Sequence, residues 1–358
     1  MGPDRRDRRR AGEGAVNAPA VLTLAVRAAD PSDAAAEAYV RTHPDATPFH
    51  LPQWSRAIAA GTGQRAHLLL AERGGAVRGV LPLTEVRSPL FGSALVSAGF
   101  GVDGGILAED VAARTALAAE AVRLAERLDC PSIELRGGPA PDGWAVETGA
   151  YAGFARDLPA GEEAILKAIP RKQRAEVRRA LGFGLAVGIG RDLDAHYRAY
   201  SESVRNLGTP VFPRALFAAT LAEFGEAADI LTVSRGGEVL ASVFSLYWRG
   251  TVYPYWGGGT RAARAARANE LMYYELMRHA SARGCTRFDF GRSKIGTGAF
   301  AFKKNWGFDP EPLSYAHWGG RREVNPLNPK YRMQIALWQR LPLWIANRLG
   351  PPIARGLG

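Results

Sequence analysis

The sequence contains an internal repeat, and this repeat constrains the fold more than any single motif does. The stretch that begins at Pro48 aligns with the stretch that begins at Pro210, at a constant offset of 162 residues. Both copies carry R-G-G-x-V at the same place. Farther along, AVRLAERLDCPSIELRGG aligns with LMRHASARGCTRFDFGRS at an offset of 155, as if one loop were seven residues shorter. Agreement over two blocks separated by one length change predicts two domains of the same fold.

Residue patterns within each copy indicate an α+β fold with mixed sheets and helices on their faces. In the second copy we expect helices at 214–223 and 268–282, and strands at 230–233, 239–248, 251–255 and 287–290. Arg-Gly-Gly-Glu between the first two strands is typical of a hairpin turn. The chain is therefore divided into a disordered lead-in (1–19), a first domain (20–155), a second domain (156–320) and a basic C-terminal tail (321–358).

Cysteine content and the N-terminal sequence predict a cytoplasmic location. The lead-in mixes Arg with Asp and runs into no apolar stretch, unlike a signal peptide. No uncharged apolar run approaches the roughly 20 residues that cross a bilayer. Cys130 and Cys285, the only cysteines, fall on equivalent positions of the two copies, so we expect them to be buried and unpaired. This cysteine usage fits a reducing compartment.

The chain is basic, with 46 Lys and Arg against 35 Asp and Glu and a net charge of +11. Such an excess favours anionic partners, among them phosphorylated substrates, RNA and lipid headgroups. Composition does not choose among these three.

One concentration of basic residues lies between the two copies, from Lys167 to Arg179. On a helix that begins near Pro170, Arg171, Arg174 and Arg178 share one face, from which guanidinium groups can bind phosphate oxygens. The alternative is an ordinary solvated basic helix face.

A second cluster is FDFGRSKIGTGAFAFKKNWGF, residues 288–308. Asp289 lies in a strand that leads into a glycine-rich turn, where exposed N–H groups beside Arg292 and Lys303 would cradle an oxyanion or phosphate. The corresponding first-copy stretch, Arg136-Gly137-Gly138, lacks the basic and aromatic residues that follow. We therefore expect function to concentrate in the second domain.

A third cluster places Arg261, Arg264 and Arg267 before a helix that starts near Asn269 or Glu270, where N–H groups can hold an anion. An exposed Arg/Ala-rich helix is the alternative. The six histidines show no metal-binding spacing, and no G-x-S-x-G is present. We therefore expect neither a metal centre nor a serine nucleophile.

The tail forms a fourth cluster. From Arg321 onward it has seven basic residues and one acidic residue, Glu323, together with Trp338 and Trp344. This composition is typical of an amphipathic segment at a membrane surface. The alternative is that its aromatic residues pack on the protein itself.

Together, the tandem strand-rich units, P-R-K-Q-R-x-E-V-R-R-A between them, and F-D-F-G-R-S followed by F-K-K-N-W-G-F resemble the FemAB-like proteins, a group of GNAT-related acyltransferases. The likeness is greatest to the branch associated with exosortase (PEP-CTERM) and exopolysaccharide gene sets. It covers about residues 20–320 and extends into the N-P-x-N-P-K-Y-R of the tail. The resemblance implies two GNAT-like domains facing a cleft, and transfer of an acyl or aminoacyl group onto an amine.

The resemblance also implies roles for individual residues. Lys303 would stabilise the oxyanion at the transferred carbonyl, Asp289 would steer or accept the amine proton, and Arg292 would contact an anion. The candidate substrate-binding residues are Arg171, Lys172, Arg174, Arg178, Tyr255, Trp256, Asn269, Ser293 and Lys304. The three arginines of this set would hold a phosphate of the donor or acceptor.

No permanently bound cofactor is expected, and the identity of the acyl donor stays open. The slot after Tyr255 lacks the Arg/Gln-x-x-Gly-x-Gly/Ala loop with which GNAT enzymes bind the CoA pyrophosphate. The chain also lacks the long charged heptad insertion of the peptidoglycan-bridge members. Acyl-CoA and aminoacyl-tRNA are therefore both candidate donors.

These observations predict an N-acyltransferase in the cytoplasm or at the inner face of the membrane. Its acceptor would be an amine-bearing precursor of an envelope component, an exopolysaccharide or an exported polymer. The alternative is a non-catalytic module that holds RNA or an anionic glycan in a basic cleft. The sequence disfavours a general single-strand RNA binder, because its basic runs are not interleaved with the regularly placed stacking aromatics that such proteins use.

Overall fold

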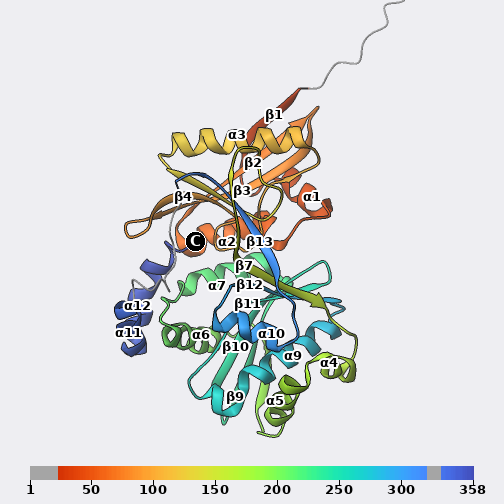
Figure 1. Cartoon of the computed structure of the whole chain (residues 1–358), viewed down its shortest axis with the longest axis vertical. Coiled ribbons are helices and arrows are strands. Elements are labelled where there is room, and N and C mark those ends of the chain that lie inside the picture. The colour runs from red at the N-terminus through yellow and green to blue at the C-terminus, as the bar shows by residue number, and fades with distance from the viewer. Residues whose placement is uncertain (1–22, 321–331) are drawn as a thin grey trace, which may run out of the picture.

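A computed structural model describes residues 23–320 and 332–358 of the chain (Figure 1). The predicted disordered lead-in at 1–19 lies outside the described residues, and so does most of the N-P-x-N-P-K-Y-R segment. Within the described residues, no helix is both long enough and apolar enough to span a bilayer.

The first half of the chain has three α-helices and seven strands among its described residues. The strands are β1 (Leu24–Ala29), β2 (Arg65–Arg73), β3 (Ala76–Ser88), β4 (Gly92–Ser97), β5 (Leu107–Ala108), β6 (Ser132–Arg136) and β7 (Ala145–Asp157). The helices are α1 (Ala34–Thr42), α2 (Pro52–Thr62) and α3 (Val111–Arg127). α3 begins where the Asp110 carboxylate accepts a hydrogen bond from the Ala113 N–H at 2.7 Å, as an N-cap does.

The second half repeats this order with additional helices. Its strands are β8 (Ala186–Gly190), β9 (Ala228–Arg235), β10 (Glu238–Trp248), β11 (Thr251–Gly259), β12 (Arg287–Lys294) and β13 (Glu311–Gly319). Its helices are α4 (Glu162–Ala168), α5 (Arg171–Leu181), α6 (Leu193–Leu207), α7 (Arg214–Phe224), α8 (Ala263–Ala266), α9 (Ala268–Ala282) and α10 (Gly298–Asn305). Two helices of the tail, α11 (Arg332–Arg340) and α12 (Leu343–Ala354), follow.

The repeat found in the sequence is a repeat of structure. α7 starts and ends 162 residues after α2, and β12 starts 155 residues after β6. The shared R-G-G motif forms the turn of the β2–β3 hairpin in one half and of the β9–β10 hairpin in the other. Both glycines of each turn have positive φ, at 59° and 79° for Gly74 and Gly75 and 57° and 84° for Gly236 and Gly237. Two-residue hairpin turns of this kind favour glycine, which explains why the motif occurs twice.

All strands belong to one mixed sheet that runs through both halves, in the order β1-β2-β3-β4-β6-β13-β7-β12-β11-β10-β9-β8, with β5 added beside β3. The order is symmetric about the β13–β7 pair. β7, the last strand of the first half, pairs with β12, and β13, the last strand of the second half, pairs with β6. Each half therefore gives its last strand to the other, and the predicted boundary at residue 155 falls inside β7.

Two features hold the halves together beside the sheet. Repeat-related helices α2 and α7 pack against each other (Figure 1). A Cβ at Gly61 would lie 2.3 Å from the Leu216 Cα, so only glycine permits this close approach. The aromatic cluster around them draws on both halves, with Phe49 and Trp54 from the first and Phe217, Phe244 and Trp256 from the second. As predicted, Cys130 and Cys285 are buried and free.

Within each half, one parallel strand pair opens into a V. β11 pairs with β12 only through Thr251–Arg287 and Val252–Phe288, and the strands diverge beyond these residues. β4 and β6 likewise pair at only two positions, Leu95–Ile133 and Val96–Glu134. Divergence leaves backbone and side chains of both strands free to line a cavity.

Candidate active site

Two adjoining pockets lie where β11 and β12 diverge. The larger has a volume of about 350 Å³ and the smaller about 210 Å³, and they share Val102, Tyr255 and Gly291. Side chains of the larger pocket include Phe100, Tyr255, Trp256, Tyr273, Phe290, Arg292, Phe302 and Lys303. Those of the smaller pocket include Asp103, Phe154, Tyr253, Arg287, Asp289 and Glu311. Residues of both halves line each pocket, so the cavity lies between the halves.

Lys303 projects from α10 toward the diverging strand β12. Its ammonium group donates hydrogen bonds to the carbonyl oxygens of Gly291, at 3.2 Å, and Arg292, at 2.8 Å. Aromatic rings surround it, with the Phe154 centroid at 5.4 Å and the Phe290 centroid at 6.0 Å. Burial lowers the pKa of Lys303 to about 7, although nearby Asp289 acts in the opposite direction. An amine with such a pKa can be charged or neutral at physiological pH.

Asp289 and Gly291 form a bulge in β12 beside Lys303. The register with β7 shifts between Asp289 and Arg292, and Gly291 has a φ of 64°. The Asp289 carboxylate accepts a hydrogen bond from the Gly291 N–H at 2.7 Å. Burial raises the pKa of Asp289 above its ordinary value, against the opposing effect of this hydrogen bond and of Lys303. β-Bulges of this kind commonly redirect side chains next to active sites.

This geometry corrects one prediction. The sequence suggested a glycine-rich turn whose N–H groups would cradle an anion, but Gly291 lies within strand β12, which continues to Lys294. Its N–H is already bonded to Asp289, and it is the carbonyl oxygens of Gly291 and Arg292 that face Lys303. The group available to an anion is therefore the lysine side chain rather than these main-chain N–H groups.

Arg292 occupies the wall of the larger pocket between two tyrosines. Its guanidinium donates to the Tyr315 hydroxyl at 2.5 Å and lies 4.9 Å from the centroid of the Tyr151 ring. Tyr151 and Tyr315 stack at 5.6 Å, and they come from β7 and β13, the two exchanged strands. The strand exchange thus fixes the position of a cationic side chain in the pocket.

Tyr255 and Trp256 come from the diverging part of β11. The Tyr255 hydroxyl donates to the carbonyl oxygen of Phe100 in the first half. Trp256 is buried and stacks on Trp54, with centroids 5.9 Å apart and planes 17° apart. Tyr255 thus lines both pockets, whereas Trp256 forms the back of the larger one.

The loop at residues 98–105 is a part of the site that was not predicted from the sequence. Ala98 and Phe100 adopt left-handed backbone conformations, with φ of 43° and 64°. Its carbonyl oxygens are fixed by Trp54, which donates to Gly99 at 3.1 Å, and by Arg136, which donates to Gly101 at 3.0 Å. Strained backbone held by its surroundings is characteristic of functional sites. The G-F-G-V-D-G-G sequence after a strand was the signal available.

Asp103 is the ionisable residue that this loop carries into the smaller pocket. Burial raises its pKa to about 6, and the negative charges of Asp289 and Asp45 add to the effect. Asp103 and Asp289 therefore form two acidic walls of one pocket, one from each half. Mutual repulsion favours binding of a cation or a proton between them.

The basic helix predicted from Pro170 is α5. Arg171, Lys172 and Arg178 are exposed on it, whereas Arg174 is half-buried and donates to the Ile169 carbonyl at 3.1 Å. None of these residues lines either pocket. The helix does adjoin the site, because a Cβ at Gly307, just after α10, would lie 2.9 Å from the ring of Pro170.

Three further candidates, Asn269, Ser293 and Lys304, also lie outside the pocket linings. The Asn269 amide oxygen and the Ser293 hydroxyl are buried, and neither has a hydrogen-bond partner in the described part of the chain. Lys304 is exposed and lies over the Phe300 ring at 6.0 Å. Of the arginine triplet, Arg267 is bonded to Glu176, while Arg261 and Arg264 are exposed.

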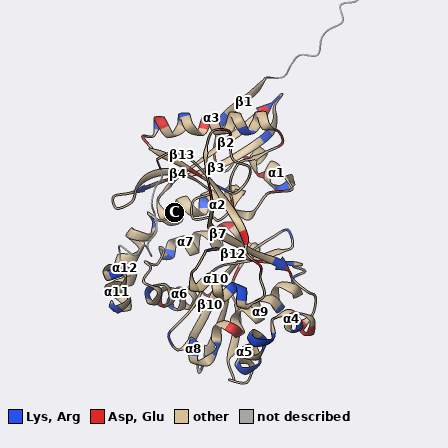
Figure 2. Ribbon diagram, viewed as in Figure 1, with Lys and Arg blue, Asp and Glu red and all other residues tan. Residues whose placement is uncertain are grey.

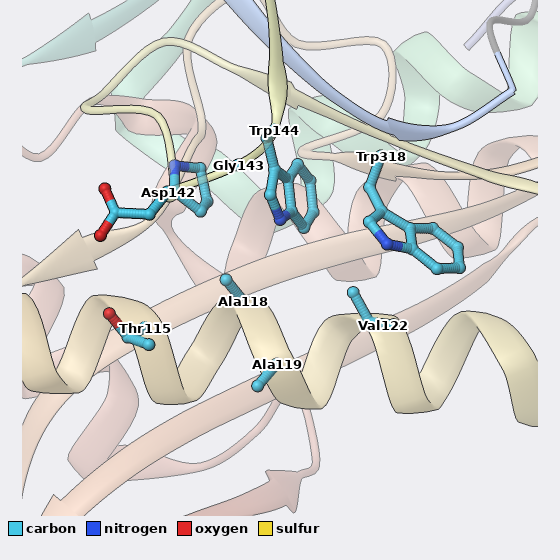
Figure 3. A pocket seen from close by; sticks show the side chains of 9 residues that line it. Thr115, Ala118, Ala119, Val122, Asp142, Gly143, Trp144 and Trp318 are labelled. Carbon is cyan, nitrogen blue, oxygen red and sulfur yellow. The ribbon is translucent and has the colours of Figure 1, made fainter.

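Another pocket, of about 350 Å³, shares no lining residue with the two pockets beside β11 and β12 and lies between α3 and the indole rings of Trp144 and Trp318 (Figure 3). Figure 3 shows both indoles facing a floor of small side chains on α3, among them Ala118 and Val122. Asp142 is the one ionisable residue in its lining. The lining of this pocket contains no cationic side chain that could stabilise an oxyanion. We therefore assign the candidate active site to the two pockets where β11 and β12 diverge.

Residues 169–304 match the protein family described as an acetyltransferase (GNAT) domain. This span contains Asp289, Arg292, Lys303, Tyr255 and Trp256. No curated protein matches the sequence.

The fold of most of the chain is similar to that of several solved structures. FemX superposes with a TM-score of 0.62 at 17% identity, over 83% of this chain and 97% of that one. The C-terminal domain of a putative lysylphosphatidylglycerol synthetase from Agrobacterium fabrum gives 0.53 at 13% identity, over 80% and 91%. A tandem GNAT protein from the clavulanic acid biosynthesis pathway gives 0.51 at 14% identity, over 85% and 100%.

Proposed function

We propose that this chain, in which residues 169–304 match a GNAT acetyltransferase domain and whose fold is similar to FemX and to a tandem GNAT protein, transfers an acyl or aminoacyl group from an activated donor to an amine. The observation that carries the proposal is the Lys303 ammonium group, which lines the larger pocket and is held by two main-chain carbonyl oxygens, one of them from Gly291, a residue that lines both pockets. In the reaction the amine nitrogen bonds to the donor carbonyl carbon, the bond to the leaving oxygen or sulfur breaks, and one proton moves from the amine to the leaving group.

Lys303 stabilises the oxyanion of the tetrahedral intermediate in this proposal. An ammonium group has three N–H donors, and two are used by Gly291 and Arg292. The third is available to the carbonyl oxygen of a donor in the larger pocket. Because apolar aromatic rings surround the ammonium group, a charge–oxyanion contact there is stronger than it would be in solution. Arg292 adds positive charge to the same pocket.

The smaller pocket receives the amine. It carries three carboxylates, Asp103, Asp289 and Glu311, against one guanidinium, Arg287, so it attracts an acceptor that arrives as an ammonium ion. Raised pKa values make Asp103 and Asp289 better proton acceptors than ordinary carboxylates. We infer that this pair takes the proton that makes the amine nucleophilic. Positioning of the two substrates on either side of Tyr255 supplies the remainder of the rate enhancement.

The donor is an acyl-CoA or an aminoacyl-tRNA, both of which carry phosphates. The exposed Arg171, Lys172 and Arg178 of α5 are suited to bind those phosphates, since Pro170 at the start of α5 contacts the segment that follows α10. The likeness of the motifs to the exopolysaccharide-associated branch supports an acceptor that is an amine-bearing precursor of an envelope or exported polymer.

The test compares wild-type protein with Lys303→Ala and with a control, Lys167→Ala, which removes an exposed lysine of α4 that lines neither pocket. Each is incubated with labelled acetyl-CoA or labelled aminoacyl-tRNA and a panel of amino sugars and diamines, and the acceptor is examined for a mass increment. We expect Lys303→Ala to lower transfer by roughly 100-fold or more, the usual cost of removing an oxyanion donor, and Lys167→Ala to leave it unchanged. Undiminished transfer by Lys303→Ala, with its fold checked by circular dichroism, would show the assigned role to be wrong.

A binding module for RNA or an anionic glycan is the second candidate, favoured by the exposed arginines of α5. Phosphate binding alone gives a linear fall of log affinity with log salt concentration and no covalent product. Mass spectrometry of the ligand that co-purifies with the protein distinguishes CoA, tRNA and a lipid-linked sugar directly.

A further inference from the structure

We propose that the outward faces of α11 and α12 form a docking surface for an anionic lipid membrane. This surface, here called the tail face, comprises Arg332, Met333, Leu337, Arg340, Trp344, Arg348 and Leu349. It is separate from the candidate active site, and its test requires no catalytic activity.

Both tail helices are fixed to the protein through their opposite faces, which lie on α6. The Gln339 side chain donates to the Asn206 carbonyl at 3.1 Å, and Arg205 donates to the Leu341 carbonyl at 2.8 Å. A Cβ at Gly208 would lie 2.4 Å from the Ile335 side chain, so α11 packs closely on the end of α6. The helices are thus held in one orientation, and their remaining faces point away from α6.

Large apolar side chains occupy the faces of α11 and α12 that point away from α6. Met333 is 83% exposed and Leu337 is 66% exposed, and both lie on one side of α11 with Arg340 at helical spacings of four and three. On α12, Trp344 is 70% exposed, and Arg348 follows it by one turn. Leu207, which ends α6 beneath α11, is 62% exposed. A tryptophan this exposed among other apolar side chains marks an interaction surface, and at membrane surfaces its ring occupies the headgroup level.

The positive charge of the tail favours an anionic partner. Residues 332–358 contain four arginines and no Asp or Glu, as the blue and tan tail helices of Figure 2 illustrate. None of these arginines forms an ion pair within the described part of the chain. Each basic residue near an anionic bilayer adds to the electrostatic attraction between the protein and the lipid headgroups. A second copy of the chain would bring the same arginines together across a symmetric interface, so the positive charge favours a lipid surface over self-association.

The proposal is tested by sedimentation of the full chain with phosphatidylcholine vesicles that contain or lack phosphatidylglycerol. Wild-type protein should sediment with the anionic vesicles and less with the neutral ones, and binding should weaken as salt rises. Leu337→Ser/Trp344→Ser and Arg340→Gln/Arg348→Gln should each lower the partition coefficient by roughly tenfold or more.

The matched control is Val111→Ser/Val146→Ser, which removes two apolar side chains exposed by 61% and 53% in the first half. It should bind as the wild type does. Equal binding by all variants, or no binding of the wild type to anionic vesicles, would overturn the proposal. If the tail-face variants instead convert a dimer to a monomer in light scattering while vesicle binding stays absent, the surface is an interface between copies and the membrane proposal is wrong.

Discussion

At the scale of single residues, Lys303 has an environment that few surface lysines share. Its charge is opposed by burial among aromatic rings and supported by Asp289 and two carbonyl oxygens. Since burial has the larger effect, its pKa falls to about 7. The proposed role as an oxyanion donor requires the charged form, which becomes scarce as pH rises above that value.

This balance predicts the pH dependence of turnover. At saturating substrates, kcat should fall as pH rises through about 7, although the acceptor amine itself becomes more nucleophilic. Lys303→Arg keeps its charge at every accessible pH, so in that variant the alkaline fall should disappear while the maximal rate drops. If both proteins show the same alkaline limb, the limb belongs to another group and Lys303 is not its origin.

Asp103 lines the smaller pocket together with Asp289. Asp103→Asn removes one of the two proton acceptors of the smaller pocket and its attraction for a cationic amine, so acceptor kcat/KM should fall by roughly 100-fold or more. KM for the donor should stay near the wild-type value, because the donor lies in the other pocket. Asp142→Asn, in the separate pocket between Trp144 and Trp318, is the matched control. An equal loss of donor binding would indicate a disturbed loop rather than a lost proton acceptor.

At the scale of elements, the position of α10 depends on Gly307. This residue has a φ of 79°, and a Cβ there would lie 2.9 Å from Pro170 at the start of α5. Pro170 belongs to the motif P-R-K-Q-R-x-E-V-R-R-A, and Gly307 belongs to the motif F-K-K-N-W-G-F. The two motifs therefore meet where the start of α5 contacts the segment that follows α10.

Gly307→Ala should therefore destabilise the protein by about 1–3 kcal/mol and displace Lys303, lowering activity. Gly296→Ala separates the two causes, because Gly296 has a φ of 80° but nothing within 4 Å of its added Cβ. Gly296→Ala should lower the free energy of unfolding through backbone strain alone, and the variant should retain its activity. Denaturant unfolding and turnover of both variants provide the comparison, and equal effects would mean that the Pro170 contact is unimportant.

Local elements were predictable from the sequence where their patterns are strong. The expected helix at 214–223 is found at 214–224, and the helix at 268–282 has the same bounds in the structure. α10 was not predicted, because Phe300 and Phe302 alternate as in a strand, although Thr297 caps the helix by accepting from the Phe300 N–H at 3.3 Å. Asp103 was missed for a different reason, since its closeness to Asp289 comes from contacts between the halves that no local pattern reveals.

At the scale of the whole molecule, the continuous sheet and the α2–α7 contact join the halves into one structure. Removing either half would expose the edge of a central strand and much of the shared aromatic cluster. The excess positive charge is also unevenly distributed, on α5 and on the tail face. Neither the sheet order nor the exchange could be read from the sequence, because pairing of strands so far apart leaves no periodic signal.

The continuous sheet predicts cooperative unfolding. Calorimetry of the full chain should give one transition, with calorimetric and van't Hoff enthalpies that agree. Gly61→Ala, which forces α2 away from Leu216, should lower that single transition temperature without splitting it. Two resolved transitions would show that the halves unfold independently.

The exchange of β7 and β13 relates this tandem chain to a dimer of a protein half its length. A half-chain ending after β7 carries a strand that its own sheet does not accept, since β7 pairs with β12 and β13. Two identical half-chains could satisfy each other's strands across a two-fold axis. The tandem protein therefore has the architecture of a strand-swapped homodimer whose subunits have been fused. Fusion allows one of the two equivalent clefts to keep Lys303 and Arg292 while the other changes freely.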